Sequence, residues 1–301
     1  MSIRCLFLLA LLLATGKTLP AQSAPAEPDD PAVEAQCRMY FPPEGPPATR
    51  YLRPGIILVT DAKPDQAPLL NKLSAAGRLL AAWTAPAQAS SRLAAPASRP
   101  TAPVPASRPA GPRPVCLALY KDAPGYERLW IRVLAYYGGG QFATIGPEGF
   151  SYRCFCASYV SATAPPLLEG LLVHEFTHVW LYQNARLPNN GNWLTEGIAS
   201  AMQMRAAPAS ANRAEFAQWV AEKRYVPLKR VMDQEHLDGK DYWQAAALAE
   251  MLAQRRGVLA KVIAAQREGM SSQRIVADVL RTDWTELTRQ WESSVRSHAA
   301  D

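Results

Sequence analysis

The sequence has no long apolar run near its N-terminus, although it begins with a short one. Cys5 to Ala14 is almost wholly apolar, whereas a membrane-spanning helix needs about 20 such residues. The run follows the basic segment Met1–Arg4 and precedes Leu19-Pro20-Ala21, which is the layout of a cleavable secretory signal. The pattern argues against a membrane anchor. It predicts a signal peptide over residues 1–21, export to the periplasm or the outside, and no transmembrane segment after cleavage.

Cysteine is scarce, with five in 301 residues, and Cys5 lies in the predicted signal. The even number that remains indicates disulfides in an exported protein, with three possible pairings among Cys37, Cys116, Cys154 and Cys156. Cys154 and Cys156 face the same way on a predicted strand, so we expect each to pair elsewhere. The alternative is that this Cys-x-Cys binds a metal, but no second cysteine or histidine pair completes such a site.

Excess charge is confined to two segments. The formal net charge is +6. Two basic residues lie in the predicted signal and four arginines lie in residues 84–114, which contain no acidic residue, so two plus four account for the whole excess. The rest of the chain is near neutral. We therefore expect no nucleic acid as a partner, and the charge does not require an anionic membrane.

Residues 84–114 are low in complexity and consist mainly of Ala, Pro, Ser and Arg. The segment Pro96–Pro100 recurs as Pro105–Pro109. Such a stretch buries too little apolar area to offset its ordering entropy. A spacer is favoured over a partner-binding segment, and an insertion within one domain over a linker between two, because residues 51–83 predict only a strand and a helix. Residues 22–50 are predicted to be a disordered or irregular mature N-terminus.

The order of the predicted elements indicates an α+β fold. Strands are predicted at Gly55–Thr60 and Val115–Tyr120 and as a hairpin within 141–160, with helices at 65–83 and 126–137. A helix is predicted from Pro165-Pro166 to about Tyr182, and helices are predicted beyond Asn192, the last one beginning with the capping residues Asp283 and Glu286. We expect one domain over 51–301, with a small mixed N-terminal sheet followed by a helical half.

Histidine is also rare, with four residues in the chain, yet two of them form the pattern His174-Glu-Phe-Thr-His178. Residues four apart project from one face of a helix, so both imidazoles can reach a single ion. Glu175 is rotated by about 100° from His174, which places it beside the ion, where it can take a proton from metal-activated water. Chance would give such a pattern in roughly one of 500 sequences with four histidines.

A third ligand is expected from the segment Trp193–Ser200, which contains Glu196 as a lone carboxylate in an apolar setting. A buried carboxylate is costly unless it is paired or binds a metal. Two His and one Glu leave the fourth position of zinc open to water, as in catalytic zinc sites. The sequence therefore predicts one Zn²⁺ per chain, held by His174, His178 and Glu196.

His-Glu-Phe-Thr-His, followed by Trp193-Leu-Thr-Glu-Gly-Ile-Ala-Ser200, resembles the gluzincin metallopeptidases, and the bacterial peptidase-MA-like proteins most of all. The resemblance is strong over about residues 165–203. It implies a thermolysin-like catalytic core, the three zinc ligands given above, and Glu175 as the general base. The Gly-x-Met-Glu-Asn motif of gluzincin aminopeptidases has no match, so aminopeptidase activity is not expected.

The resemblance also implies a donor that stabilises the transition state, often a tyrosine on a later helix. Tyr242 is the candidate, with His236 behind it, although a tyrosine on an apolar helix face is more often a core residue. Such an exported zinc metallopeptidase would act on a peptide or protein strand paired with the sheet edge near 141–160. Two alternatives remain. One is a catalytically silent, zinc-stabilised binding or cell-envelope scaffold, and the other is a metal-dependent hydrolase of non-peptide substrates.

Overall fold

The computed structural model describes residues 48–62, 66–86, 113–137, 149–152, 155–160, 165–208 and 213–298. The predicted signal peptide, the chain up to residue 47 and most of the predicted insertion lie outside these residues, and the predictions made for them stay predictions. Within the described part of the chain, no helix is both long and apolar enough to span a membrane.

The N-terminal half of the fold is built on a small mixed sheet of five strands. The strands are β1 (Thr49–Arg53), β2 (Ile56–Thr60), β3 (Val115–Tyr120), β4 (Gly149–Tyr152) and β5 (Phe155–Tyr159), in the spatial order β1-β2-β3-β5-β4. The three central strands β2, β3 and β5 run parallel, and each edge strand is antiparallel to its neighbour. β1 starts two residues before the predicted domain boundary. It was not predicted, because four of its five residues are exposed and it has no apolar run.

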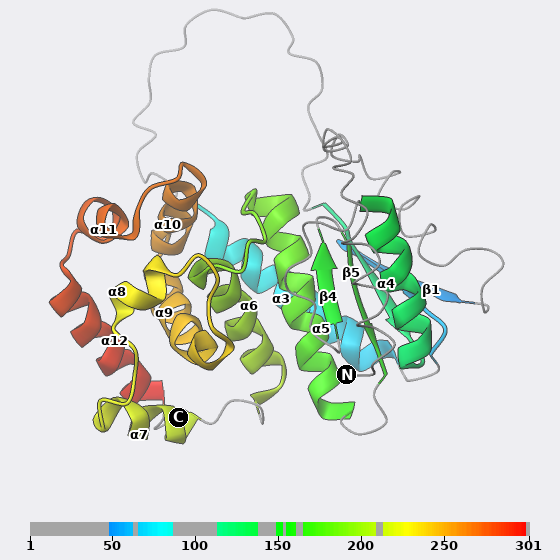
Figure 1. The fold of residues 1–301 in the computed structure, drawn as a ribbon, viewed down its shortest axis with the longest axis horizontal. Coiled ribbons are helices and arrows are strands. Elements are labelled where there is room, and N and C mark those ends of the chain that lie inside the picture. Colours follow the sequence, from blue (N-terminus) through cyan, green and yellow to red (C-terminus); the bar gives the residue numbers. More distant parts are fainter. Residues whose placement is uncertain are drawn as a thin grey trace, which may run out of the picture.

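Helices cover both faces of this sheet (Figure 1). One face packs against α4 (Ala123–Tyr137), and the other faces α3 (Gln66–Thr84) and α5 (Pro165–Trp180). The central strands β2 and β3 are buried along their whole lengths, as expected of parallel strands with helices on both sides. The predicted helix at 65–83 is confirmed, and the helix predicted from 126 begins three residues earlier, at Ala123.

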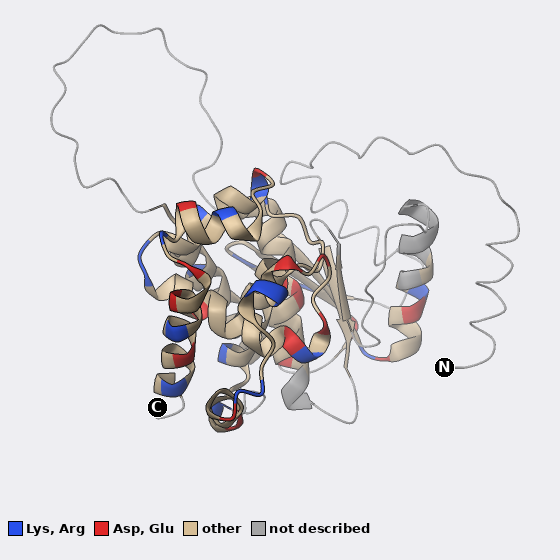
Figure 2. Cartoon of the chain, turned by 60° about the vertical axis from the view of Figure 1, so that its left-hand side comes forward, with Lys and Arg blue, Asp and Glu red and all other residues tan. Residues whose placement is uncertain are grey.

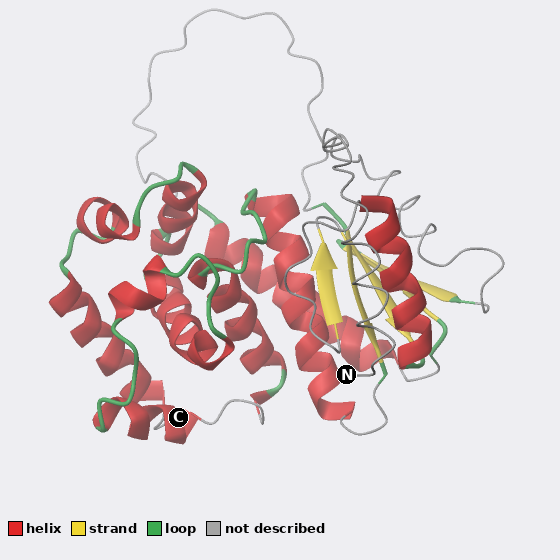
Figure 3. Cartoon of the chain, viewed as in Figure 1, coloured by secondary structure: helices red, strands yellow, loops and turns green. Residues whose placement is uncertain are grey.

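The second half of the fold is helical (Figure 3). Its α-helices are α6 (Trp193–Ala206), α7 (Arg213–Ala221), α8 (Leu228–Asp233), α9 (Tyr242–Gln254), α10 (Val258–Arg267), α11 (Ser272–Arg274) and α12 (Trp284–His298). Shorter elements are the π-turns η1 (Leu181–Ala185) and η4 (Ile275–Val279) and the 3-10 turn η3 (Gly239–Asp241). One apolar cluster runs without interruption from Ile56 on β2 to Val295 on α12. A second, smaller cluster lies between the other face of the sheet and α4. The described residues therefore form an α+β fold with a small mixed sheet followed by a helical half, as predicted.

Acidic and basic residues are interspersed along the described helices (Figure 2). On α12, Arg289 pairs with Glu286 at 2.6 Å and Arg296 pairs with Glu292 at 3.5 Å. These pairs are local and lie within about one helical turn. The first is typical of a solvated helix face, whereas the second involves the buried Glu292. Both agree with the near-neutral charge of the chain outside the predicted signal and insertion.

The prediction that Cys156 forms a disulfide is wrong. Cys116 is disulfide-bonded, whereas Cys156 is a free thiol that is fully buried. The strand register places Cys156 opposite Leu117, on the sheet face that packs against α5. The side chain of Cys116 lies on the other face. Cys156 therefore behaves as a small core residue, and burial raises the pKa of its thiol well above the ordinary value.

Candidate metal centre

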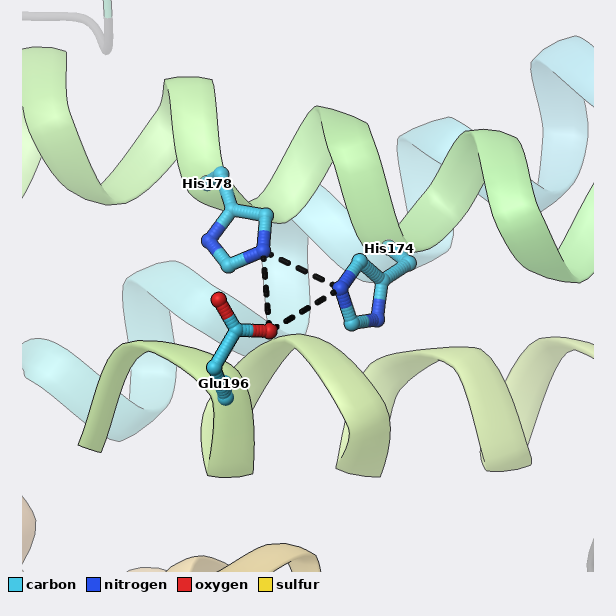
Figure 4. A group of neighbouring side chains, drawn as sticks. All are labelled: His174, His178 and Glu196. Atoms are coloured by element: carbon cyan, nitrogen blue, oxygen red, sulfur yellow. Dashed lines mark hydrogen bonds and ion pairs between the residues drawn. The ribbon is translucent and has the colours of Figure 1, made fainter. Parts of the chain in front are cut away.

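Two packed helices, α5 and α6, carry the predicted ligands. His174 and His178 stand one turn apart on α5, in a stretch that is buried from Leu172 to Trp180. Glu196 lies in the first turn of α6, which begins at Trp193. The side chain of Asn192 caps this helix by accepting hydrogen bonds from the backbone N–H groups of Leu194 and Thr195. In Figure 4 the two imidazoles project from one helix toward the Glu196 carboxylate on the other.

The three side chains bring their ligand atoms together. The Nε2 atoms of His174 and His178 are 3.0 Å apart, and the Glu196 Oε2 atom lies 3.3 Å from the first and 3.5 Å from the second. Ligand atoms of a tetrahedral zinc ion, with bonds of about 2.0–2.1 Å, lie about 3.3 Å from one another. The observed separations fit one ion of that size. Within the described residues, this is the one group of three or more His, Cys, Asp or Glu side chains that could hold a metal ion.

The burial of the three candidate ligands also favours the binding of a cation between them. His174, His178 and Glu196 are 7%, 4% and 6% exposed. The Glu196 Oε2 atom and both Nδ1 atoms are buried without a hydrogen-bond partner among the described residues. An unsatisfied buried polar atom is destabilising, and a divalent ion would satisfy the carboxylate directly. The two Nδ1 atoms face away from the cluster, where a metal-binding histidine usually donates to a further group or to water.

Electrostatics keep the carboxylate of this group ionised. Burial alone would raise the pKa of Glu196, but the facing imidazoles of His178 and His174 outweigh it and hold that pKa well below its usual range. Burial also opposes the charged form of His178, while Glu196 and then Glu175 favour that form, and the net result is a raised pKa for His178. The pocket therefore favours positive charge beside Glu196, which a metal ion would supply.

Glu175 lies next to the cluster without being part of it. Its residue is 9% exposed, and it is not one of the three converging ligands. The edge strand β4 passes over it: a Cβ atom added to Gly149 would lie 3.4 Å from the Glu175 Cγ atom. The charge of Glu175 also acts on His178. Glu175 thus lies near the three converging side chains and against β4, and its role beside an ion stays a prediction.

Tyr242, the predicted donor, is the first residue of α9 and lies at the same place. Its ring stacks on that of His174, with centroids 6.2 Å apart and planes inclined by 7°. Burial raises the pKa of the Tyr242 hydroxyl, and the charge of Glu196 and a hydrogen bond to it add to the effect. His236 is placed differently. It is exposed, and its Nδ1 atom lies 2.9 Å from the carbonyl oxygen of Asn190, in the loop that leads to α6.

Three further residues that shape the site were not singled out from the sequence. Asn192 caps the ligand helix, and a polar residue just before an apolar helical stretch is a signal that could have revealed it. Gly149 and Gly197 matter because of what lies against them in space. No local pattern distinguishes these two glycines from others in the chain.

The geometry thus defines a candidate site for one metal ion, between the sheet-bearing and the helical parts of an α+β protein. Comparison with protein-family models gives no match for this chain, and comparison with curated proteins gives none either. The residues themselves and their arrangement therefore carry the functional argument.

Proposed function

We propose that this protein is an exported zinc metallopeptidase of the gluzincin type, similar to the bacterial peptidase-MA-like proteins and built on a thermolysin-like catalytic core. The observation that carries the proposal is the convergence of His174, His178 and Glu196 within 3.0–3.5 Å of one another, with Glu175 beside them. His174, His178 and Glu196 would hold the zinc. When bound, zinc supplies Lewis-acid chemistry, because it acidifies water and polarises a carbonyl group.

Glu175 is proposed as the general base. Its carboxylate would accept a proton from the attacking water and pass that proton to the leaving amine. The side chain projects from the same helix as the two histidines but at a different angle, so it can act next to the ligands without binding in their place. It is largely buried, which shields the proton transfer from bulk solvent.

Tyr242 is proposed as the donor to the developing oxyanion. For that task its hydroxyl must stay protonated, and its raised pKa favours the protonated form at all ordinary pH values. A hydroxyl that is already oriented beside the reacting group needs little reorganisation during the reaction. The stacking of its ring on His174 keeps the side chain next to a proposed ligand, as this role requires.

The substrate is proposed to be an extended peptide along β4. Among the strands that the structure describes, β4 pairs with β5 on one side and stands last in the order of the sheet. Exposed sheet edges bind peptides through main-chain hydrogen bonds. Because Gly149 lies against Glu175, a peptide on this edge would pass close to the base. The missing Gly-x-Met-Glu-Asn motif argues against recognition of a free amino terminus, so cleavage within peptides is favoured.

One observation favours the scaffold alternative. The ligands come from α5, which packs on the sheet, and from α6, which belongs to the helical half. A metal here would therefore also cross-link the two parts of the fold. A purely structural zinc would stabilise the protein in the same way as a catalytic zinc, without any turnover.

Glu175→Gln distinguishes the two functions. In a peptidase it should keep about one zinc per chain and lower the cleavage of casein or of a peptide mixture by about 100-fold or more, since general bases contribute about 10²–10⁴-fold. In a scaffold it should change nothing. Glu169→Gln is the matched control, because Glu169 lies on the same helix and pairs with Lys72 away from the cluster. Equal turnover in the wild type and Glu175→Gln would contradict the peptidase mechanism.

A further inference from the structure

At Gly197, the backbone of α6 packs directly against the backbone of α9 at Ala245. A Cβ atom added to this residue would lie 2.6 Å from the carbonyl oxygen of Ala245 and 2.8 Å from its carbonyl carbon. It would also lie 3.1 Å from the Ala245 Cβ atom. Both residues are buried. Atoms in protein interiors are packed to contact and do not overlap, so at this point no side chain fits between the helices.

The contact stands next to a site residue on each helix. Gly197 directly follows the ligand Glu196, and Ala245 comes three residues after Tyr242. Residues three apart lie on the same side of a helix, one turn from each other. The side of α9 that touches α6 is therefore also the side that carries Tyr242 toward His174 and Glu196. The spacing of the two helix axes at Gly197 controls how near the Tyr242 hydroxyl comes to the ligands.

The start of α9 is the less enclosed side of this contact. Residues Trp193–Met202 of α6 are all buried, and Asn192 caps the helix. Most of α9 is buried too, but its first residue, Tyr242, is only partly buried, and the chain before the buried Asp241 is exposed at residues 238–240. A side-chain pair holds α9 from its other side: the Gln244 amide bonds the N–H and the carbonyl oxygen of Val226, at 2.9 and 2.8 Å. The start of α9 is thus seated between α6 and residue 226.

We propose that Gly197 is a positioning residue for the reaction. Because Gly197 has no side chain, its backbone can contact Ala245 directly, and this contact places Tyr242 at the metal centre. This inference rests on the proposed function and deepens it, since it explains why a glycine must follow the ligand Glu196. Any larger residue would push the start of α9 away by roughly 0.5 Å or more, because backbone atoms cannot interpenetrate. Tyr242 would retreat with it, while the three ligands stay together.

The test is Gly197→Ala, assayed for zinc content and for turnover. We expect about one zinc per chain, a KM within about twofold of the wild type, and a kcat lowered by about 10- to 100-fold, since a misplacement of about 1 Å can cost about 10²-fold. In the Tyr242→Phe background, Gly197→Ala should lower kcat by no more than about twofold further, because both changes remove the same interaction. If the fold-losses in kcat of Gly197→Ala and Tyr242→Phe multiply in the double variant, the proposal is overturned and Gly197→Ala has a general structural defect.

A crystal structure of Gly197→Ala tests the same contact independently of any activity assay. We expect the ring centroids of Tyr242 and His174 to lie farther apart than 6.2 Å, with the 3.3 Å contact between His174 and Glu196 kept. An unmoved Tyr242 would overturn the positioning role. A wild type that neither binds zinc nor cleaves peptides would instead contradict the proposed function, so the two failures are distinguishable.

Two more variants complete the experiment. Gly77→Ala is the control, since a Cβ atom there would meet Phe176 at an ordinary 3.5 Å, and we expect it to leave zinc content and kcat unchanged. If Gly197→Ala does not fold, the double variant Gly197→Ala/Ala245→Gly relieves the 3.1 Å contact with the Ala245 Cβ atom and keeps the 2.6 Å contact with the Ala245 carbonyl oxygen. It should keep the zinc and still lower kcat by about 10-fold or more, because the backbone clash remains. An unchanged kcat in this double variant would overturn the proposal.

Discussion

Asn192 and Thr195 hold each other at the start of the ligand helix. The Thr195 backbone N–H donates to the Asn192 Oδ1 atom at 3.1 Å, and the Thr195 hydroxyl donates to the Asn192 carbonyl oxygen, also at 3.1 Å. Both residues are buried. These two bonds, both donated by Thr195 to Asn192, fix the turn of backbone that leads directly into Glu196. The position of the third ligand therefore depends on a helix cap as well as on the packing of α6 against α5.

Replacing Asn192 should weaken the metal site. Asn192→Ala removes the cap and is expected to lower the free energy of unfolding by about 1–2 kcal/mol. It should also lower zinc affinity by about 10-fold, as the loss of outer-shell support commonly does. Urea unfolding of the metal-free protein and competitive zinc titration measure the two effects. Asn192→Ser, which keeps a capping oxygen, should restore most of both. Asn189→Ala should leave zinc affinity unchanged, because Asn189 is exposed and its side chain bonds Ser151 on β4 and not α6.

Removing the Tyr242 hydroxyl should separate catalysis from folding. Tyr242→Phe keeps the ring that stacks on His174 and removes the proposed donor. We expect unchanged zinc content, a similar KM and a kcat lowered by about 100-fold, the cost of losing one oxyanion donor. Steady-state kinetics on a peptide, together with metal analysis of the same samples, would measure this. A kcat equal to that of the wild type would make Tyr242 a core residue.

The buried carboxylate of Glu292 should make stability fall in acid. Glu292 accepts hydrogen bonds from Lys223 and Tyr225, and it lies 3.5 Å from Arg296. Burial alone would raise its pKa, but these partners outweigh burial, and the pKa is lowered on folding. Ionised Glu292 therefore stabilises the fold above its unfolded pKa of about 4.3, and this contribution is lost as the pH falls through the lower folded pKa.

Glu292→Gln should accordingly lower the free energy of unfolding by about 1.5–3 kcal/mol at pH 7, the range for hydrogen bonds to a charged group. The difference from the wild type should shrink as the pH falls below about 4. Urea unfolding at pH 7 and pH 3 would show it. Glu286→Gln serves as the control, because Glu286 is on the same helix, is only partly buried and pairs locally with Arg289, and it should have the smaller effect at pH 7. A difference that is the same at both pH values would contradict this role of Glu292.

The sequence predicted the parts of the fold that depend on local pattern. The buried strands at Ile56–Thr60 and Val115–Tyr120, the helix with His174 and His178, and the helix with Glu196 follow from apolar runs and spacing. The exposed edge strand β1 has no such pattern. The helix predicted to end near Tyr182 instead changes to a π-turn at Leu181, a difference in hydrogen bonding that residue types do not reveal.

Features that join distant parts of the chain were harder to predict. The placement of Gly149 over Glu175 and of Gly197 against Ala245 depends on how a strand and two helices pack. The free thiol of Cys156 follows from the strand register, which turns its side chain into the core. The proximity of Tyr242 to His174 was proposed from a resemblance, since nothing in the spacing of these two residues requires it.

The central claim is that His174, His178 and Glu196 hold one zinc ion, and zinc stoichiometry tests it most directly. The protein should be purified without chelator, shown to be folded, and analysed as wild type and as Glu196→Ala, with casein proteolysis measured alongside. We predict close to one zinc per chain in the wild type, and loss of both zinc and proteolysis in the variant, because two histidines alone leave the ion with too few protein ligands. Folded wild-type protein that contains no zinc and takes up none would contradict the account.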